Sequence, residues 1–302
     1  MLELVHFATI GVSASAPESF LAIVVVTSAE PGEGKTGVAA AIARHFAYEG
    51  RPVRLVRAGS GERAERDAAW FGSLDFVPGS HTVPVDAATI ADDPDALLVV
   101  EVDATDAGAI DGPRVAVGRG SGGAVANAVA TVRTALRCAG PLKTDGTAPV
   151  IELAEDRTLA GFSLDEARDA LHAQTLVEGD FDPPTCDYLV VAPIASDAGQ
   201  PYFRRFHTKA VVVRFDRTDM HLAAMQADPA FLILTGGRQP SGYLFDAAGA
   251  KGVPVILSAN DTENTVMALE DIYERTRFHG ERKLDRMAQL LDDSPLYAAL
   301  TV

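Results

Sequence analysis

The feature that most constrains the fold is a continuous apolar run at residues 21–26, which leads into a loop containing two glycines, Gly32 and Gly34. The run is rich in β-branched residues and has no polar position, which is typical of a strand buried on both faces of a parallel sheet. A pattern of helical period spans residues 38–48, and Gly50 follows it as a stop signal. A strand, a loop and a helix in this order predict the first unit of an α/β domain.

The same alternation continues along the chain. In the first half we predict further strands at residues 53–56, 97–102 and 114–117 and a helix at 124–138. In the second half we predict strands at 150–153, 188–192, 210–213, 231–234 and 253–257, and helices near 164–174 and 262–275. Strands that alternate with helices indicate a doubly wound α/β fold.

The length of 302 residues suggests two domains. A polar segment of small residues around 142–149 separates two α/β cycles, so we place the boundary there. The first domain then covers residues 1–148 and the second covers residues 149–302. Near the end of the chain Leu284, Met287 and Leu291 share one face of a predicted C-terminal helical tail. This tail either covers the domain to which it belongs or docks onto a partner.

Composition argues against several classes of function. Lys and Arg number 26 against 42 Asp and Glu, and the net charge of −16 repels nucleic-acid backbones and anionic lipids. The two cysteines, Cys138 and Cys186, are far apart in the sequence, and no histidine pattern matches a zinc hydrolase. No apolar run approaches the roughly 18 residues of a membrane span. We therefore expect a cytoplasmic protein with neither a nucleic-acid nor a membrane partner.

Residues 28–36 read Ser-Ala-Glu-Pro-Gly-Glu-Gly-Lys-Thr and lie between the buried strand and the helix, the context of a phosphate-binding loop. Gly32 and Gly34 allow successive N–H groups to form a nest for phosphate oxygens at the positive end of the helix. Lys35 would reach the β- and γ-phosphates, and the hydroxyl of Thr36 would bind Mg²⁺. The pattern departs from G-x-x-x-x-G-K-T at its first position, where this chain has Ala29.

This loop predicts ATP, or another nucleoside triphosphate, and Mg²⁺ as cofactors, with Lys35 and Thr36 as catalytic residues. The residues expected to bind the nucleotide are Glu30, Gly32, Glu33, Gly34, Lys35, Thr36 and Gly37. A glycine turn that binds no ligand is the alternative. The hypothesis would fail if protein side chains filled the nest, or if the lysine were held in an internal ion pair and turned away.

A carboxylate at the end of a nearby strand is needed to hold Mg²⁺ together with Thr36. Glu101 and Asp103 close the apolar run at 97–102 and are the predicted metal residues. The alternative is that they only begin a polar loop. Asp67, just before Trp70 and Phe71, is a further candidate, although a solvated helix face explains it equally well.

Residues 118–123, Gly-Arg-Gly-Ser-Gly-Gly, match the dinucleotide pattern G-x-G-x-x-G. No acidic residue follows at about 20 residues to hold a ribose. The segment is therefore interpreted as a crossover loop rather than an NAD(P) site.

The Pro-Gly-Glu-Gly-Lys segment at residues 31–35 resembles the Walker A loops of the dethiobiotin synthetase, ParA/MinD and bacterial tyrosine kinase branch of P-loop proteins. This resemblance implies a P-loop NTPase domain with a Rossmann-like parallel sheet. ParA and MinD relatives carry an extra lysine at the start of the loop, where this chain has Glu30. The resemblance therefore does not extend to an ATP-sandwich dimer.

The second half resembles the DRTGG domain. The resemblance rests on Phe-Asp-Arg-Thr-Asp-Met at 215–220 and on Leu-Ile-Leu-Thr-Gly-Gly at 232–237. In the N-terminal part of long bacterial phosphate acetyltransferases this domain follows a dethiobiotin-synthetase-like domain. The resemblance implies a smaller α/β domain, a regulatory or oligomerising role and a probable homodimer arrangement. Acetyltransferase activity is not expected, because the sequence contains no counterpart of the catalytic domain.

The DRTGG segments also suggest a second ligand site, since charged groups at the carboxyl ends of strands are where open α/β sheets bind ligands. The residues of this site are Asp216, Arg217, Thr218, Asp219, Thr235, Gly236 and Gly237. Structural ion pairs and a glycine turn are the competing interpretation.

Three functions remain open from the sequence. The first is a cytoplasmic ATP-binding regulatory or accessory protein, with or without slow hydrolysis, whose DRTGG domain senses a ligand or mediates assembly. The second is an ATP-dependent ligase or kinase that acts on a small carboxylate, in which Arg57 would be a substrate-side cation unless it is simply exposed. The third is a structural domain that has lost its nucleotide.

Overall fold

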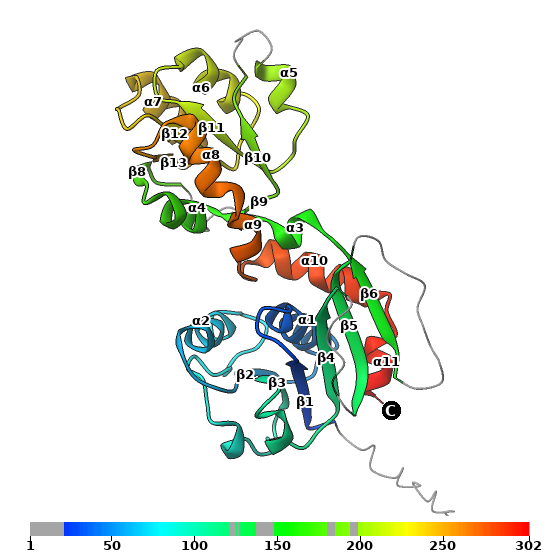
Figure 1. The fold of residues 1–302 in the computed structure, drawn as a ribbon. Coiled ribbons are helices and arrows are strands. Elements are labelled where there is room, and N and C mark those ends of the chain that lie inside the picture. The colour runs from blue at the N-terminus through cyan, green and yellow to red at the C-terminus, as the bar shows by residue number, and fades with distance from the viewer. Residues whose placement is uncertain are drawn as a thin grey trace, which may run out of the picture.

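The computed structural model describes residues 21–120, 125, 127–136, 148–179, 185–193 and 199–301. The chain forms two α/β domains, each around its own sheet (Figure 1). The C-terminal helices, drawn in red, lie against the first domain rather than the second. The predicted α/β class is confirmed.

The first domain contains a six-stranded sheet in the order β2-β3-β1-β4-β5-β6, and all neighbouring strands are parallel. Its central strand, β1, pairs with β3 and β4. The strands are β1 (Ile23–Ser28), β2 (Val53–Arg57), β3 (Leu97–Asp103), β4 (Arg114–Arg119), β5 (Ala128–Leu136) and β6 (Val150–Ala154). Helices α1 (Lys35–Tyr48) and α2 (Glu62–Phe71) and the short 3₁₀ turns η1 (Ala87–Thr89) and η2 (Ala107–Ala109) accompany them.

All six residues of β1 are buried because both faces of the strand enter a core. Val24 and Val26 pack in the cluster that contains the apolar face of α1. Ile23 and Val25 belong to a second cluster on the opposite face of the sheet. This two-sided burial explains why the sequence of the strand is continuously apolar instead of alternating.

The second domain is built on a five-stranded sheet in the order β10-β11-β12-β13-β8, in which only the β13–β8 pair is antiparallel. Its strands are β8 (Gln174–Val177), β10 (Tyr188–Val191), β11 (Lys209–Arg214), β12 (Phe231–Thr235) and β13 (Val255–Leu257). The helices are α4 (Leu164–Leu171), α5 (Gly199–Phe203), α6 (Thr218–Met225), α7 (Gly242–Lys251), α8 (Thr262–Glu270) and α9 (Ile272–Arg275). Between the two sheets lie helix α3 (Arg157–Ala160) and a small antiparallel pair of strands (Figure 1). The strands of this pair are β7 (Phe162–Ser163) and β9 (Thr185–Cys186).

After α9 the chain returns to the first domain as α10 (Glu281–Asp292) and α11 (Leu296–Leu300). Helix α10 packs against α1, and α11 packs against β5. The apolar face that was recognised in the sequence, Leu284, Met287 and Leu291, is buried in the main core of the first domain. The tail therefore covers a domain of its own chain, but it is the first domain and not the one from which it emerges.

Two other expectations differ from the structure. The helix predicted at 124–138 is wrong, because residues 128–136 form β5, whose inward residues Ala130 and Val132 are fully buried. Strand β6 pairs with β5 in the first sheet, although the boundary at residue 148 assigned it to the second domain. In β5, apolar and β-branched residues recur at short intervals, a pattern that fits either a helix or a strand. Pairing with the neighbouring strands then determines that the segment is a strand.

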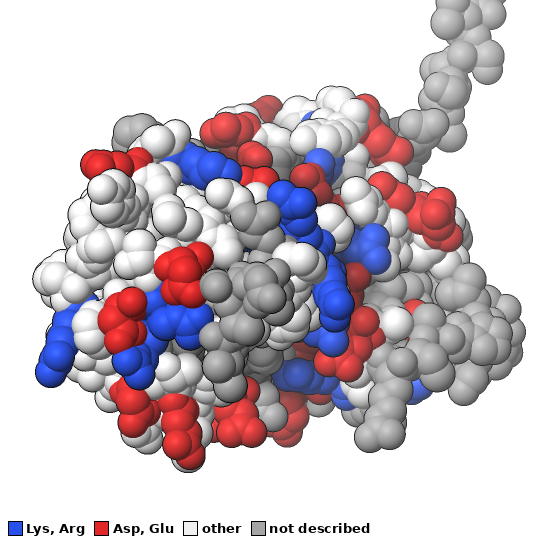
Figure 2. All heavy atoms as spheres, turned by 90° about the horizontal axis from the view of Figure 1, so that it is seen from above, with Lys and Arg blue, Asp and Glu red and all other residues white. Residues whose placement is uncertain are grey.

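The surface seen from above the second domain carries Lys and Arg side chains interspersed with Asp and Glu (Figure 2). Among the described residues on this face, basic side chains lie between acidic ones instead of forming a broad basic surface of the kind that follows a nucleic-acid backbone. Within the described residues, no helix combines the length and the apolar character needed to cross a membrane.

Replacing Leu291 by alanine tests the role of the C-terminal helices. Leu291 is fully buried in the core of the first domain, so we expect Leu291→Ala to lower the free energy of unfolding by about 3 kcal/mol. Leu222→Ala is the matched control, because this leucine is 40% exposed and its loss should cost no more than about 1 kcal/mol. Urea denaturation measures both, and equal effects would contradict the packing of α10 described here.

Candidate functional site

The loop between β1 and α1 presents a row of backbone amides. In the part of the chain that the structure describes, the amides of residues 32–37 donate no hydrogen bond. Gly32 and Gly34 have φ angles of +85° and +101°, a conformation that would strain a larger residue. Because Gly34 is the N-cap of α1, these amides lie at the positive end of the helix. The local geometry is that of a potential anion site.

Lys35 lies buried at the first turn of α1. Its Nζ is 2.6 Å from Oδ1 of Asp103 and 3.1 Å from Oγ of Ser28. Ser28 ends β1 and Asp103 ends β3, and the two residues are register partners in this parallel pair. The lysine is therefore held in an internal ion pair, which is the first part of the condition under which the nucleotide hypothesis would fail, and its ammonium contacts the carboxyl ends of β1 and β3.

The next residue, Thr36, contacts the second predicted carboxylate. Its Oγ1 donates a hydrogen bond of 3.2 Å to Oε1 of Glu101. Glu101 is 2% exposed and lies on β3, two residues before Asp103. The structure thus brings together Lys35, Thr36, Glu101 and Asp103, which were predicted from separate parts of the sequence.

The side chain of Glu33 folds back onto the loop. Its Oε2 accepts a 3.1 Å hydrogen bond from the amide of Glu30, and its Oε1 accepts one of 3.4 Å from the amide of Arg119. The hydroxyl of Thr134 donates to the carbonyl of Glu33 at 3.1 Å. The carboxylate of Glu33 therefore occupies the amide at the start of the loop, whereas the amides of residues 32–37 stay open to a ligand.

Arg57 is the cationic centre of the site. Sequence reasoning left open whether it was exposed, and it is 3% exposed at the end of β2. Its Nη2 is 3.1 Å from Oδ2 of Asp103, and its Nε is 3.7 Å from Oε1 of Glu101 and 3.8 Å from Oδ2 of Asp67. Asp67 thus faces the site from α2 and is not a solvated helix residue.

Burial and charge act differently on the three carboxyl groups. Burial, reinforced by the charge of Asp67, raises the pKa of Glu101 to about 7. Burial also raises the pKa of Asp67, against the influence of the nearby arginines. For Asp103 burial acts upward, but the hydrogen bond from Lys35 and the charge of Arg57 hold its pKa below the usual value. Asp103 is therefore the ionised partner of the two cations.

The oxygen atoms at this edge suit a hard cation. Oε2 of Glu101 is buried and has no hydrogen-bond partner among the described residues, and Thr36 adds a hydroxyl beside it. Mg²⁺ with a nucleotide needs one or two protein carboxylates in addition to phosphate oxygens. No group of three or more His, Cys, Asp and Glu side chains in the described ranges is arranged to hold a metal without such a ligand. The oxygens present at this edge are of the kind that Mg²⁺ prefers when phosphate oxygens complete its ligands.

The charged residues of the second predicted site form local pairs. Arg214 pairs with Asp216, and Arg217 pairs with Asp219 through two hydrogen bonds of 3.0 Å. All four side chains are at least partly exposed, and they lie between the end of β11 and the first turn of α6. Thr218 makes only a long contact of 3.4 Å with Ser241. These contacts match the structural interpretation of the segment, and they leave a ligand at this position as a prediction.

The Thr-Gly-Gly segment that follows β12 forms a tight turn. The amides of Gly236 and Gly237 donate to the carbonyls of Asn260 and Ser258, and both glycines have positive φ angles. A Cβ on Gly236 would lie 2.8 Å from the ring of Phe215. Thr235 shares a 2.8 Å hydrogen bond with Thr262. The glycines are therefore needed for the turn itself.

The segment at 118–123 is only partly within the described residues. Gly118 and Arg119 end β4, and Gly120 follows with a φ angle of +63°. The rest of the G-x-G-x-x-G pattern lies outside them.

One contact to the phosphate-loop helix was not anticipated. The ring of Phe278, which precedes α10, lies against Gly37 in the first turn of α1, and a Cβ on Gly37 would be 2.7 Å from it. The same ring makes an edge contact with Trp70 of α2, with centroids 5.7 Å apart. The only sign of this contact in the sequence was Gly37 itself, because a glycine lets another side chain approach the backbone closely.

The raised pKa of Glu101 predicts a dependence of stability on pH. Between the ordinary value of 4.5 and about 7, the folded protein keeps a proton that the unfolded chain loses. Stability therefore falls as pH rises through this window, whereas Glu101→Gln cannot lose a proton. Relative to this variant, we expect the wild type to lose on the order of 3 kcal/mol between pH 4.5 and 7.5.

Urea unfolding at several pH values, in buffer with EDTA and without nucleotide, measures this difference. Asp246→Asn removes an exposed carboxylate on α7 and should leave the pH profile of the wild type unchanged. Parallel profiles for the wild type and Glu101→Gln would contradict the buried position of Glu101.

Comparison with known proteins bears on the second domain. The model of the DRTGG domain family matches residues 166–272. Among solved structures, the CBS and DRTGG domains of the regulatory region of Clostridium perfringens pyrophosphatase, complexed with the activator diadenosine tetraphosphate, match with 20% identity and a TM-score of 0.32. The match covers 38% of this chain and 48% of that one, so it spans about half of the regulatory fragment. Residues 166–272, the central part of the second domain, are a DRTGG domain.

Proposed function

We propose that this chain binds a nucleoside triphosphate, most naturally ATP, with Mg²⁺ at the loop between β1 and α1, and that its DRTGG domain regulates the bound state or mediates assembly as a homodimer. The observation that carries the proposal is the row of free amides at residues 32–37, which adjoins Lys35 and Thr36 at the sheet edge where Glu101 and Asp103 end β3. Unpaired N–H groups at a helix N-terminus attract phosphate oxygens.

Nucleotide binding would replace the carboxylate of Asp103 at Lys35 by a phosphate group. The lysine now pairs with Asp103 and Ser28 across the start of the loop, so a small rotation of its side chain toward the amides would let it contact the terminal phosphates. A buried ammonium keeps a negative partner throughout this exchange, which limits the electrostatic cost. The internal ion pair is therefore interpreted as the ligand-free arrangement of a phosphate site.

The carboxylate of Glu33 lies at the same loop, so it would either move away when the nucleotide binds or remain beside the phosphates. It accepts hydrogen bonds from the amide of Glu30 at 3.1 Å and from the amide of Arg119 at 3.4 Å, and both would have to break or adjust when phosphate enters. Arg63 lies over the same part of the loop, with Nη1 at 3.6 Å from the position of a Cβ on Gly32. This exposed guanidinium adds a positive charge that would offset Glu33 when phosphate enters.

Thr36, Glu101 and Asp103 would hold Mg²⁺ beside the phosphates. Bound there, the ion would neutralise phosphate charge. Thr36 and Glu101 are already hydrogen-bonded to each other, so both oxygens are positioned before the ligand arrives. The chain's own contribution is to orient these oxygens and to exclude water from the buried side of the site.

A regulatory role fits the site better than a ligase or kinase. Arg57, the residue that would bind a substrate carboxylate, is already surrounded by Asp67, Glu101 and Asp103 and is almost completely buried. A small acid would have to displace these carboxylates from the arginine. A rise of ATP turnover by orders of magnitude on addition of one small carboxylic acid would instead support the ligase.

Calorimetric titration with MgATP tests nucleotide binding directly. Lys35→Ala removes the ammonium that would turn from Asp103 to the terminal phosphates, so we expect the Kd to rise at least about 30-fold. Arg275→Ala is the control, because Arg275 is exposed on α9 of the second domain, where it pairs with Asp271, and its loss should leave the Kd unchanged. Circular dichroism verifies that both variants fold. Equal binding by Lys35→Ala and the parent, or no binding by the parent, would refute the proposal.

Asp103→Asn separates the two roles of this carboxylate. In EDTA the variant should bind ATP several-fold more tightly, because the phosphates no longer compete with Asp103 for Lys35. With Mg²⁺ present it should bind more weakly, because a metal residue is lost. Asp106→Asn, an exposed change in the loop after β3, is the control for net charge. A Kd that shifts in the same direction in both buffers would contradict these roles.

A further inference from the structure

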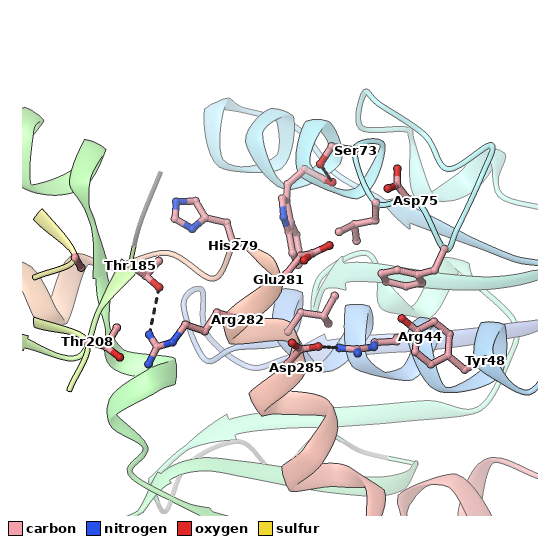
Figure 3. A pocket seen from close by; sticks show the side chains of 16 residues that line it. Arg44, Tyr48, Ser73, Asp75, Thr185, Thr208, His279, Glu281, Arg282 and Asp285 are labelled. Carbon is pink, nitrogen blue, oxygen red and sulfur yellow. Dashed lines mark hydrogen bonds and ion pairs between the residues drawn. The ribbon is translucent and has the colours of Figure 1, made fainter. Parts of the chain in front are cut away.

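A cavity of about 980 Å³ lies at the junction of the two domains (Figure 3). One wall comes from α1 and from the end of α2 with the loop after it, and the opposite wall comes from Thr185 and Thr208 of the second domain. The start of α10 forms the floor between them. The volume is at the upper end of the range for small-molecule sites, so a ligand of moderate size would contact both domains.

The two arginines that line the cavity are already neutralised. Arg44 is hydrogen-bonded to Asp285, and Arg282 is bonded to Asp187 and, at 3.3 Å, to Thr185. Figure 3 shows Arg44 directed toward Asp285 and Arg282 directed toward Thr185. Neither guanidinium is therefore available to pair with an anionic ligand without breaking an ion pair.

The lining carboxylates that remain carry the opposite charge. Asp75 and Glu281 both line the cavity, and neither has an ion-pair or hydrogen-bond partner among the described residues. They come from different elements, Asp75 from the loop after α2 and Glu281 from the first turn of α10. The uncompensated charge of the lining is thus negative, and so is the net charge of −16 on the whole chain.

Aromatic rings complete the wall next to these carboxylates. Trp70, Phe76 and Tyr48 line the cavity, and Tyr48 and Phe76 form an edge pair with centroids 6.1 Å apart. The guanidinium of Arg44 lies over the ring of Tyr48, 5.0 Å from its centroid, so a ligand cation would meet Trp70 and Phe76 instead. Aromatic faces together with free carboxylates are the features that recognise alkylammonium groups, because a ring face attracts a cation while the carboxylate neutralises it.

We propose that the junction cavity is a binding site for a small organic cation, a primary amine or polyamine. Its ammonium groups would pair with Asp75 and Glu281, and its alkyl chain would lie along Trp70 and Leu74. This site is separate from the phosphate loop, since none of its lining residues belongs to the loop. An occupant would join the two domains and would touch the segment next to Phe278, which packs on Gly37.

Intrinsic fluorescence tests this proposal at the site itself, because Trp70 is the single tryptophan of the chain. Titration of the full chain with spermidine should give a saturable change in tryptophan emission. Asp75→Asn/Glu281→Gln keeps the reporter and removes both carboxylates, and we expect the Kd to rise about tenfold. Asp246→Asn/Glu270→Gln changes the net charge equally at exposed positions outside the cavity and should shift the Kd less than about twofold.

Two further variants sharpen the experiment. Phe76→Leu should weaken spermidine binding by a few-fold through loss of an aromatic face. Lys35→Ala should leave spermidine binding intact, so failure at the phosphate loop is distinguishable from failure here. An emission change that does not saturate, or equal losses in the cavity variant and the exposed control, would overturn the proposal. So would an ATP-induced emission change that persists in Lys35→Ala and exceeds that of spermidine.

Discussion

The structure of the first domain depends on charge balance at one buried edge of its sheet. Lys35 and Arg57 are both at most 5% exposed, and Asp103 contacts both of them. Charges in such a place are tolerated only when they are paired and hydrogen-bonded. The parallel register of β1 and β3, which sets Ser28 opposite Asp103, brings the pair together. The same register puts the loop, the carboxylates and the positive end of α1 within reach of one another.

Local patterns in the sequence predicted much of this arrangement. The apolar run of β1, the glycines of the loop and the helical period of α1 act within a few residues of one another, so they can be recognised without tertiary information. The carboxylates at the end of β3 were found because the strands of a parallel sheet end at one edge. β5 was mistaken for a helix, because a short segment with alternating small and β-branched residues suits either state until its neighbours decide.

What the sequence could not predict depends on residues far apart in the chain. The burial of Arg57 requires Asp67, Glu101 and Asp103 to surround it, and these residues come from two other segments, α2 and β3. The closure of the loop by Glu33 depends on the amide of Arg119 in β4. The contact of Phe278 with Gly37 joins residues 241 positions apart, and only the missing Cβ of the glycine hinted at it. In the second domain the DRTGG motif identified the segment between β11 and α6 correctly. Its charged side chains form ion pairs with residues two positions away, which the motif did not predict.

The path of the chain has a mechanical consequence. Because β6 belongs to the first sheet and α10 packs on α1, the DRTGG domain is an insertion whose entry and exit are both anchored to the same body. A domain anchored at both ends can tilt or twist but cannot drift away, and a protease that cuts one connection would leave the fragments associated. A rearrangement within the insertion therefore acts on both connections at once. One of these connections is α10, which packs along α1, the helix that carries Lys35.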